Sequence, residues 1–244
     1  MTSDNDDLNF EVTADSYYSD FGDGYIGKHY DHELESTKEL CRFMEETVGE
    51  KDNLTILDAG CGDGNIINYL MKRFPGSRFT GFDIARAMVD YAQKKLPNVV
   101  KIEKGDLLNM DVYAQEKFDV VYTVHTLSLF PEFEPVIKQL INSTRSHLFI
   151  NSLFDDHNVD MYTIVKEPNF PQIQWNIFSK ERVKKYCIEQ GAKKVIFRPF
   201  NMPFPLNEPK EGMGSYTKQL IDGTYITFSG PLFLPWYLVR VDFI

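Results

Sequence analysis

The chain has 244 residues and a formal net charge of −10 at pH 7, with 43% hydrophobic and 25% charged residues. This composition is that of an ordinary globular protein, and the length suits one α/β domain with an insertion or a cap. The acidic balance and the lack of a long Lys/Arg cluster disfavour a nucleic-acid partner, because such proteins neutralise phosphates with a basic face.

Two further features bear on where the protein works. The three cysteines, Cys41, Cys61 and Cys187, lack metal-ligand spacing, and free thiols in a reducing compartment explain them most simply. The acidic amino terminus lacks the apolar centre of a signal peptide, and the apolar runs are too short to span a bilayer. We therefore predict a cytoplasmic protein without a membrane partner, acting as a monomer or a homodimer.

Residues 1–30 are predicted to form a flexible amino-terminal lid. The first ten residues are polar, and a stretch rich in Tyr, Gly and Asp follows, which we expect to lie over a ligand as short helices and turns. The main domain is predicted over residues 31–244. It begins with a helix from about residue 31 to 47, because apolar residues recur there at helical spacing.

Strands and helices alternate in the middle of the chain. We predict strands over residues 54–58, 78–82, 99–103, 118–123 and 147–153, and helices over residues 65–74, 85–96 and 132–144. This alternation predicts a parallel sheet with right-handed crossovers and helices on both faces.

The last third departs from this alternation. We expect a helix over residues 179–190, with Ser179 as N-cap and Gly191 as C-cap, and strands over residues 194–200 and 232–243. The insertion 201–230 holds no long helix pattern, so the two strands that flank it should be antiparallel. The predicted fold class is α/β, with a seven-stranded mostly parallel sheet, an antiparallel last strand, helices on both faces and an amino-terminal lid.

The most informative feature is a glycine-rich turn after the first predicted strand. An apolar run ends at Asp58, and Gly60, Gly62 and Gly64 follow before a helix pattern begins. Glycines at such a turn allow unusual backbone conformations and the close approach of a nucleotide-like ligand. The dinucleotide fingerprint G-x-G-x-x-G would need glycine where Asn65 stands, and no G-K-[ST] of a P-loop follows. A carboxylate at Asp58 would repel a pyrophosphate, but it can pair with an ammonium group.

The segment Asp58-Ala-Gly-Cys-Gly-Asp-Gly64 resembles the first motif of class I S-adenosylmethionine-dependent methyltransferases. Matches to later motifs follow in the same order, at Gly81-Phe-Asp-Ile84, Gly105-Asp-Leu107 and Phe118-Asp-Val-Val-Tyr-Thr-Val-His-Thr-Leu127. Together they cover roughly residues 50–150, and the ordered set is far more specific than any one of them.

The resemblance implies S-adenosylmethionine as cofactor and S-adenosylhomocysteine as product. It assigns both ribose hydroxyls to Asp83 and the adenine amino group to Asp106, although either aspartate also suits a helix cap. Met88 and Leu107 are expected to cover the adenine, and Met88 suits a core position equally well. The residues expected at the cofactor are Tyr30, Asp58, Gly60, Cys61, Gly62, Asp83, Ile84, Met88, Asp106, Leu107 and Thr123.

His125 is the candidate catalytic residue because it follows the fourth strand, where the resemblance places methyl transfer. An unperturbed imidazole titrates at about pH 6.5, so it can accept a proton at cellular pH. A substrate-positioning donor and a structural residue are the alternatives. A base is needed only if the acceptor has a proton to lose, because alignment and exclusion of water supply much of the acceleration.

An aromatic lid is predicted around the acceptor and favours a small apolar or peptide-like compound. The candidate residues are Tyr25, His29, Tyr162, Trp175 and Tyr216, with Phe178, Met213 and Trp236 as further possibilities. His147 is expected at the surface or as a cap. No metal is predicted, because Asp155-Asp-His157 lacks a partner carboxylate after the fourth strand.

We therefore predict methyl transfer from S-adenosylmethionine to a small-molecule or peptide acceptor. Oxygen of a hydroxyl or carboxylate is the favoured accepting atom, and nitrogen is next. Two alternatives stay open. An NAD-dependent oxidoreductase also needs an acidic residue about 20 residues past its glycines. A non-catalytic S-adenosylmethionine-binding partner subunit would share the same motifs.

Overall fold

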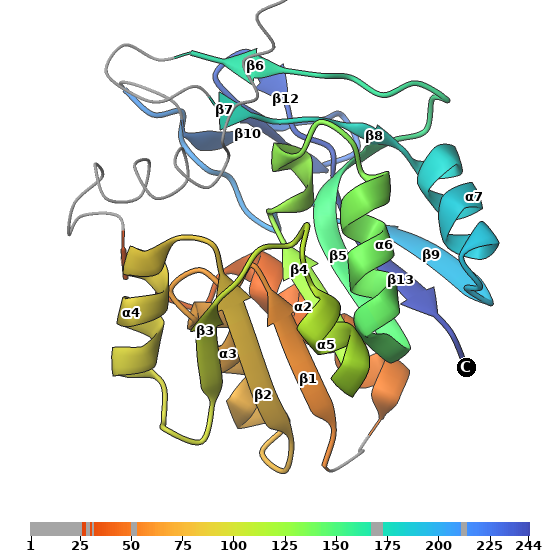
Figure 1. Ribbon diagram of the computed structural model, residues 1–244. Helices are drawn as coiled ribbons and strands as arrows, with labels where there is room; N and C mark the ends of the chain where they lie inside the picture. Colours follow the sequence, from red (N-terminus) through yellow and green to blue (C-terminus); the bar gives the residue numbers. More distant parts are fainter. Residues whose placement is uncertain (1–25, 28–29, 31, 50–52, 167–172, 211–213) are drawn as a thin grey trace, which may run out of the picture.

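The computed structural model describes residues 26–27, 30, 32–49, 53–166, 173–210 and 214–244, so most of the predicted lid lies outside the described residues. A central β-sheet lies between two layers of helices (Figure 1). Its strands are β1 (Thr55–Ala59), β2 (Arg78–Asp83), β3 (Lys101–Lys104), β4 (Phe118–Val124), β5 (Thr144–Asp155), β9 (Lys194–Pro199) and β13 (Trp236–Asp242).

The strand order is β3-β2-β1-β4-β5-β13-β9, and the short strand β8 (Phe178–Ser179) pairs with the end of β5. The strands from β3 to β5 are parallel, whereas β13 is antiparallel to both β5 and β9. The predicted fold class is confirmed. The reversed β13 also weighs against the nicotinamide alternative, whose doubly wound sheet is parallel in its usual form.

Helices cover both faces of the sheet (Figure 1). Contacts group α2 with α3 and α4, and α5 with α6 and α7. Their bounds are α2 (Glu35–Val48), α3 (Asn65–Arg73), α4 (Arg86–Lys95), α5 (Asp111–Glu116), α6 (Glu134–Ser143) and α7 (Lys180–Glu189). The predicted N-cap of α7 is confirmed, since Ser179 Oγ accepts the Arg182 backbone N–H at 3.4 Å.

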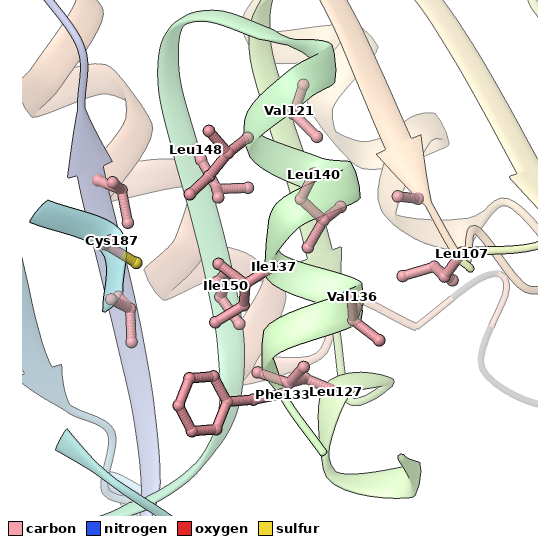
Figure 2. Close-up of a cluster of buried hydrophobic side chains, with 14 of the residues drawn as sticks. Leu107, Val121, Leu127, Phe133, Val136, Ile137, Leu140, Leu148, Ile150 and Cys187 are labelled. Carbon is pink, nitrogen blue, oxygen red and sulfur yellow. The ribbon is translucent and has the colours of Figure 1, made fainter. Parts of the chain in front are cut away.

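The alternation of side chains along β4 and β5 divides the core between the two faces. Leu148 and Ile150 pack against α6, and Figure 2 shows them beside Ile137 and Leu140 of that helix. Tyr122 and Phe149 point to the opposite face and pack with α2, α3 and α4. Each such apolar side chain contributes roughly 1.5–3 kcal/mol by leaving water. The strand ends that carry the glycine turn are therefore rigidly supported.

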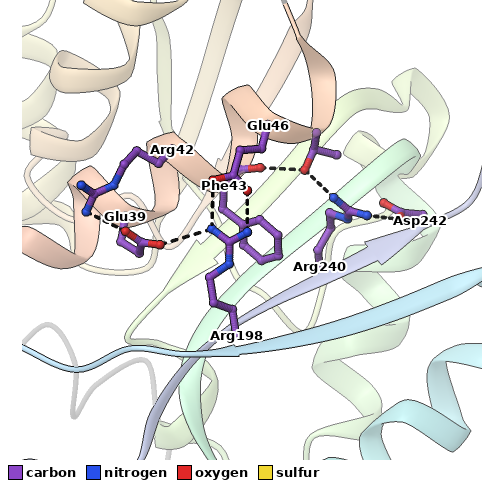
Figure 3. A network of polar contacts seen from close by, with 8 residues as sticks. Glu39, Arg42, Phe43, Glu46, Arg198, Arg240 and Asp242 are labelled. Atoms are coloured by element: carbon purple, nitrogen blue, oxygen red, sulfur yellow. Dashed lines mark hydrogen bonds and ion pairs between the residues drawn. The ribbon is translucent and has the colours of Figure 1, made fainter. Parts of the chain in front are cut away.

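A polar network fastens α2 to the outer strands (Figure 3). Arg198 of β9 forms ion pairs with Glu39 and Glu46, and its guanidinium carbon lies 3.9 Å from the ring centroid of Phe43. Arg240 of β13 donates to Thr47 Oγ1 at 2.8 Å. This network therefore joins α2 to β9 and β13.

His147 was expected at the surface or as a cap, and this prediction is wrong. The residue lies in β5 opposite Asp242 of β13, is only 8% exposed, and its Nδ1 atom is 2.8 Å from Asp242 Oδ1. The partner is 95 residues away in the sequence, so local pattern gave no sign of the pair.

The insertion between β9 and β13 folds into a small antiparallel sheet of β10 (Ser215–Gln219), β11 (Tyr225–Ser229) and β12 (Leu232–Phe233). The predicted last strand, residues 232–243, is wrong in its first part, because β12 belongs to this small sheet. Pro235, which cannot donate a ladder hydrogen bond, separates β12 from β13. A second pair, β6 (Ile164–Val165) and β7 (Ile173–Gln174), lies with it above the carboxyl ends of β4 and β5 (Figure 1).

None of the helices in the described ranges is long and apolar enough to cross a membrane.

Candidate active site

The glycine turn joins the carboxyl end of β1 to α3. Gly60, Gly62 and Gly64 have φ angles of +85°, +54° and +80°, in the left-handed region that favours glycine. A Cβ atom on Gly60 would lie 2.9 Å from Thr126 Oγ1, and one on Gly64 would lie 2.7 Å from Leu96 Cδ1. At Gly62, by contrast, no described atom lies within 4 Å of that position. Packing therefore requires two of these glycines, whereas Gly62 borders open space that a ligand can enter.

Asp58 lies beneath this turn and is 1% exposed. Neither carboxyl oxygen has a hydrogen-bond partner of normal geometry in the described part of the chain. Burial raises the pKa of Asp58 to about 8, and Asp83 and Asp63 add to the rise, while the nearby Tyr122 hydroxyl opposes it. A cation placed here would stabilise the ionised carboxylate. The ammonium group of S-adenosylmethionine fits this requirement.

Asp83, at the end of β2, fastens the turn. Its Oδ2 atom accepts the Gly62 N–H and its Oδ1 atom accepts the Ala85 N–H, both at 2.9 Å. An ionised carboxylate is an acceptor at both oxygens, as a ligand with hydroxyl groups requires. The capping role and the ligand role are therefore compatible in one side chain.

Asp106, Leu107 and Met88 lie at the neighbouring strand ends. Asp106 is half-buried, and its Oδ1 atom accepts the Leu108 N–H at 2.9 Å at the start of a turn. Leu107 is buried, with Cδ1 3.5 Å from the Cβ position of Gly60, and Met88 is buried in the first turn of α4. Ile84 is half-buried between β2 and α4. The turn, Asp83 and Leu107 thus lie together, as expected for one ligand site.

Three other residues that were predicted to bind the cofactor are buried and pack within the protein. Thr123 is fully buried, and its hydroxyl donates to the Ala59 carbonyl oxygen at 2.7 Å, joining β4 to β1. The Tyr30 ring packs edge-on against Tyr91 of α4, with ring centroids 5.8 Å apart. Cys61 is buried, and burial raises the pKa of its thiol well above the usual value.

The predicted acceptor residues are less closely gathered. Tyr25 and His29 lie outside the described residues. Tyr162 is 60% exposed, and Trp175 packs against the small cluster of Leu153, Ile177 and Leu234. Tyr216 is buried in the three-stranded sheet, where its hydroxyl donates to the Gly230 carbonyl oxygen at 2.9 Å.

His125 lies at the end of β4 in the left-handed conformation, with φ +59°. Its backbone N–H donates to the Asn151 carbonyl oxygen at 2.9 Å, and its ring centroid is 4.6 Å from that of Trp236. Surrounding protein atoms lower the pKa of His125, and the Asn151 side chain opposes this. Because the ring also has an exposed surface, hydration keeps the shift smaller than full enclosure would produce. The imidazole is therefore neutral at cellular pH.

Asn151 was not predicted. It is a polar residue within the apolar strand 147–153, and it is 1% exposed. An amide within a mostly apolar strand is the signal that the sequence offered for it.

Two hollows of the described surface lie at the other edge of the sheet. Both are lined by Asn53 and Asp119, near the amino ends of β1 and β4. Ligands of open α/β sheets bind at the carboxyl ends of the strands. We therefore place the cofactor at the glycine turn and not in these hollows.

Among the residues that the structure describes, no three His, Cys, Asp or Glu side chains are grouped to hold a metal ion. Asp155 and His157 contact each other.

A protein-family model described as "Methyltransferase domain" matches residues 56–147. The chain is 26% identical over 172 residues to a malonyl-[acyl-carrier protein] O-methyltransferase of Acetivibrio thermocellus, covering 66% of this chain and 60% of that protein. It is 27% identical over 121 residues to a trans-aconitate 2-methyltransferase of Escherichia coli, covering 48% and 47%. The chain thus spans less than two thirds of the length of either relative.

Solved structures share the fold over a longer range. The magnesium protoporphyrin IX methyltransferase from Synechocystis PCC 6803 with bound S-adenosylmethionine superposes with a TM-score of 0.59 at 16% identity. The match covers 98% of this chain and 99% of that one. At this identity the likeness concerns the fold, including the part beyond residue 147.

Proposed function

Because the chain belongs to the class I S-adenosylmethionine-dependent methyltransferases, we propose that it transfers a methyl group to an oxygen atom of a small-molecule or peptide acceptor. Nitrogen is the second choice of accepting atom. The cofactor residues proposed above are those that surround the glycine turn.

The buried Asp58 carboxyl group beneath an open Gly62 is the observation that carries this proposal. An isolated buried carboxylate costs several kcal/mol unless a charge compensates it. A ligand with an ammonium group meets that need, whereas the pyrophosphate of a dinucleotide would worsen it. Asp83 would hold the ribose, and Asp106 and Leu107 would border the adenine.

When bound, S-adenosylmethionine supplies an electrophilic methyl group on a sulfonium, and the electron pair of the broken C–S bond stays with sulfur. The chain's own contribution is alignment and the exclusion of water, and positioning alone is worth ~7–11 kcal/mol in favourable cases. The small sheets above β4 and β5 would supply the walls for this. His125 would hold or accept a proton at a ring nitrogen if the acceptor loses one.

The names of the relatives support oxygen as the accepting atom. One is an O-methyltransferase, and both malonyl and trans-aconitate acceptors carry carboxyl groups. Neither name decides between a carboxylate and a hydroxyl in this chain, because the aligned parts omit much of each relative.

The test has two stages. Isothermal titration with S-adenosylhomocysteine and, separately, with NAD decides which ligand the turn binds. Incubation with methyl-labelled S-adenosylmethionine and panels of organic acids, alcohols, amines and peptides then identifies any labelled product. Binding of NAD alone would overturn the family-based proposal. Binding of S-adenosylhomocysteine without turnover of any panel would instead favour a non-catalytic partner subunit.

A further inference from the structure

A buried amide lies beside the candidate base. Asn151 belongs to β5 and pairs in register with Val124 of β4, the residue before His125. The Asn151 carbonyl oxygen accepts the His125 backbone N–H at 2.9 Å. The two residues are therefore held side by side at the carboxyl ends of adjacent parallel strands, above the core.

The orientation of the amide is determined by its other contact. Asn151 Nδ2 donates to the Tyr237 carbonyl oxygen at 3.0 Å, and a carbonyl can only face a donor. The opposite end, Oδ1, is buried and has no hydrogen bond of normal geometry in the described structure. Strands β13 and β4 flank β5 on opposite sides, so an amide whose nitrogen faces Tyr237 of β13 turns its oxygen toward β4, where His125 lies. The Asn151 side chain also raises the pKa of His125, in agreement with an acceptor on that side.

The histidine itself is held in an uncommon conformation. A left-handed φ at a residue other than glycine costs about 1–3 kcal/mol and persists only where the surroundings enforce it. Trp236 contacts the ring at a tilt of 56°, with centroids 4.6 Å apart. Backbone strain and aromatic contact together point the ring away from the regular course of β4.

In a neutral imidazole one ring nitrogen carries a proton and donates, and the other has a lone pair and accepts. The hydrogen-bond partner of the donating nitrogen therefore determines which nitrogen is the acceptor. If the N–H points to Asn151 Oδ1, the other nitrogen can only accept. We propose that Asn151 is a positioning residue that fixes this tautomer of His125, so that the outer ring nitrogen takes the proton of a hydroxyl acceptor.

This inference rests on the proposed function and specifies its substrate class. As the acceptor oxygen forms the new C–O bond, the C–S bond breaks and its electron pair goes to sulfur, and the hydroxyl proton moves to His125. An ionised carboxylate has no proton to give and would face a lone pair on that nitrogen. His125 and Asn151 together therefore favour an alcohol or phenol over a carboxylate as the methyl acceptor.

Two substitutions distinguish the role of the hydrogen-bond acceptor Oδ1 from that of the rest of the Asn151 side chain. Asn151→Asp and Asn151→Leu both lose the donor to the Tyr237 carbonyl oxygen, but only the aspartate retains an acceptor near the ring. The matched control is Ser152→Ala, since Ser152 is equally buried, has no hydroxyl partner in the described structure and lies on the other face of β5.

The first readout is independent of turnover. Long-range proton–nitrogen NMR of the protein without cofactor reports the tautomer and titration of each of the five histidines, and His125→Gln assigns the signal. We expect one neutral tautomer for His125 in the parent protein and in Ser152→Ala, and both tautomers in Asn151→Leu. Asn151→Asp should raise the proton affinity of the ring by about tenfold or more, as an adjacent opposite charge does.

The second readout is methyl transfer as a function of pH. With a hydroxyl acceptor, His125→Gln should lower kcat by about 100-fold or more with little change in KM. Asn151→Asp should move the acidic limb of the kcat/KM profile upward, while Asn151→Leu should lower kcat.

The outcomes are distinguishable. Identical tautomers and titrations in the parent protein and Asn151→Leu would overturn the role of Asn151. A carboxylate acceptor methylated at the parental rate by His125→Gln would overturn the substrate class and leave the proposed function intact. The expected NMR changes without turnover of any acceptor would count against the proposed function and not against the pair.

Discussion

The two halves of the candidate site are built in different ways. The half proposed for the cofactor uses consecutive residues at the ends of β1, β2 and β3, and its main contacts are between backbone and carboxylate, such as Asp83 with Gly62 and Ala85. The half proposed for the acceptor combines β4 with β5 and β13, which lie far apart in the sequence. Its contacts include pairs of side chains from distant strands, such as His125 with Trp236.

This difference concerns what each half must recognise. A turn that presents backbone atoms and two carboxylates suits one invariant ligand, because backbone geometry tolerates little variation. Side chains from distant strands and from two small sheets can be changed one at a time. We therefore expect substitutions in the cofactor half to change cofactor binding and stability together. Substitutions in the acceptor half should change one of these properties without the other.

The largest expected effect is at Asp58, in the cofactor half. Unfolded aspartate titrates at about pH 3.9, whereas the folded carboxyl group has a pKa of about 8, because it is buried. Between these values the folded protein retains a proton that the unfolded chain releases. The stability linked to this proton is complete below about pH 4 and is lost as the pH rises toward about 8.

In that window the free energy of unfolding of the parent protein should fall by up to about 1.4 kcal/mol per pH unit because of Asp58, and Asp58→Asn should abolish this fall. Urea unfolding of the protein without ligand, between pH 5 and 8, measures this slope. The same substitution should weaken S-adenosylhomocysteine binding, because the ammonium group loses its counter-charge. Asp90→Asn, an exposed change of equal charge on α4, is the control. Parallel slopes for all three proteins would contradict the buried, unpaired state of Asp58.

Asp83→Ala should give the next largest effect. Loss of its charge-assisted bonds is expected to weaken S-adenosylhomocysteine binding at least tenfold, or ~1.4 kcal/mol. Because Gly62 and Ala85 also lose an acceptor, the unfolding free energy should fall as well, by about 1–3 kcal/mol. Calorimetric titration and denaturant unfolding measure the two quantities. Unchanged affinity would mean that the ribose is held elsewhere.

The contrast between the halves also explains what the sequence could predict. The glycine turn, Asp58 and Asp83 lie within residues 58–83, and their chemistry depends on local order along the chain. Hydrophobic periodicity and the absence of a helix pattern before β13 were sufficient for the sheet and its reversed strand. These features are local, or follow from a general rule of chain connection.

The acceptor half could not be predicted in this way. Asn151 was missed because a polar residue in a strand says nothing about which residue it faces across the sheet. The three-stranded sheet of the insertion was missed because its strands are short and their ladders join them to one another. The hydroxyls of Thr123 and Tyr216 form bonds to Ala59 and Gly230, and neither separation in sequence leaves a local pattern.

A smaller effect is expected where α2 meets the acceptor half. Arg198→Met would remove both the ion pairs to Glu39 and Glu46 and the guanidinium that lies over the Phe43 ring (Figure 3). Because these pairs are partly exposed, we expect a loss of only about 1 kcal/mol in unfolding free energy. Arg42→Met is the control, since its pair with Glu39 is more exposed, and its loss should lie within about 0.5 kcal/mol. Equal losses would mean that the contact with Phe43 contributes nothing.

The smallest expected effect distinguishes packing from recognition at Tyr216. Its hydroxyl already donates to the Gly230 carbonyl oxygen, and its ring stacks on Phe228 with centroids 5.6 Å apart. Tyr216→Phe should therefore cost about 0.5–1.5 kcal/mol in unfolding free energy, the usual worth of one hydrogen bond. Cofactor affinity and acceptor KM should not change, because the lost group faces the small sheet. An increase in acceptor KM at unchanged stability would instead mean that the hydroxyl turns toward the acceptor, as the sequence first suggested, and would extend the acceptor half into the insertion.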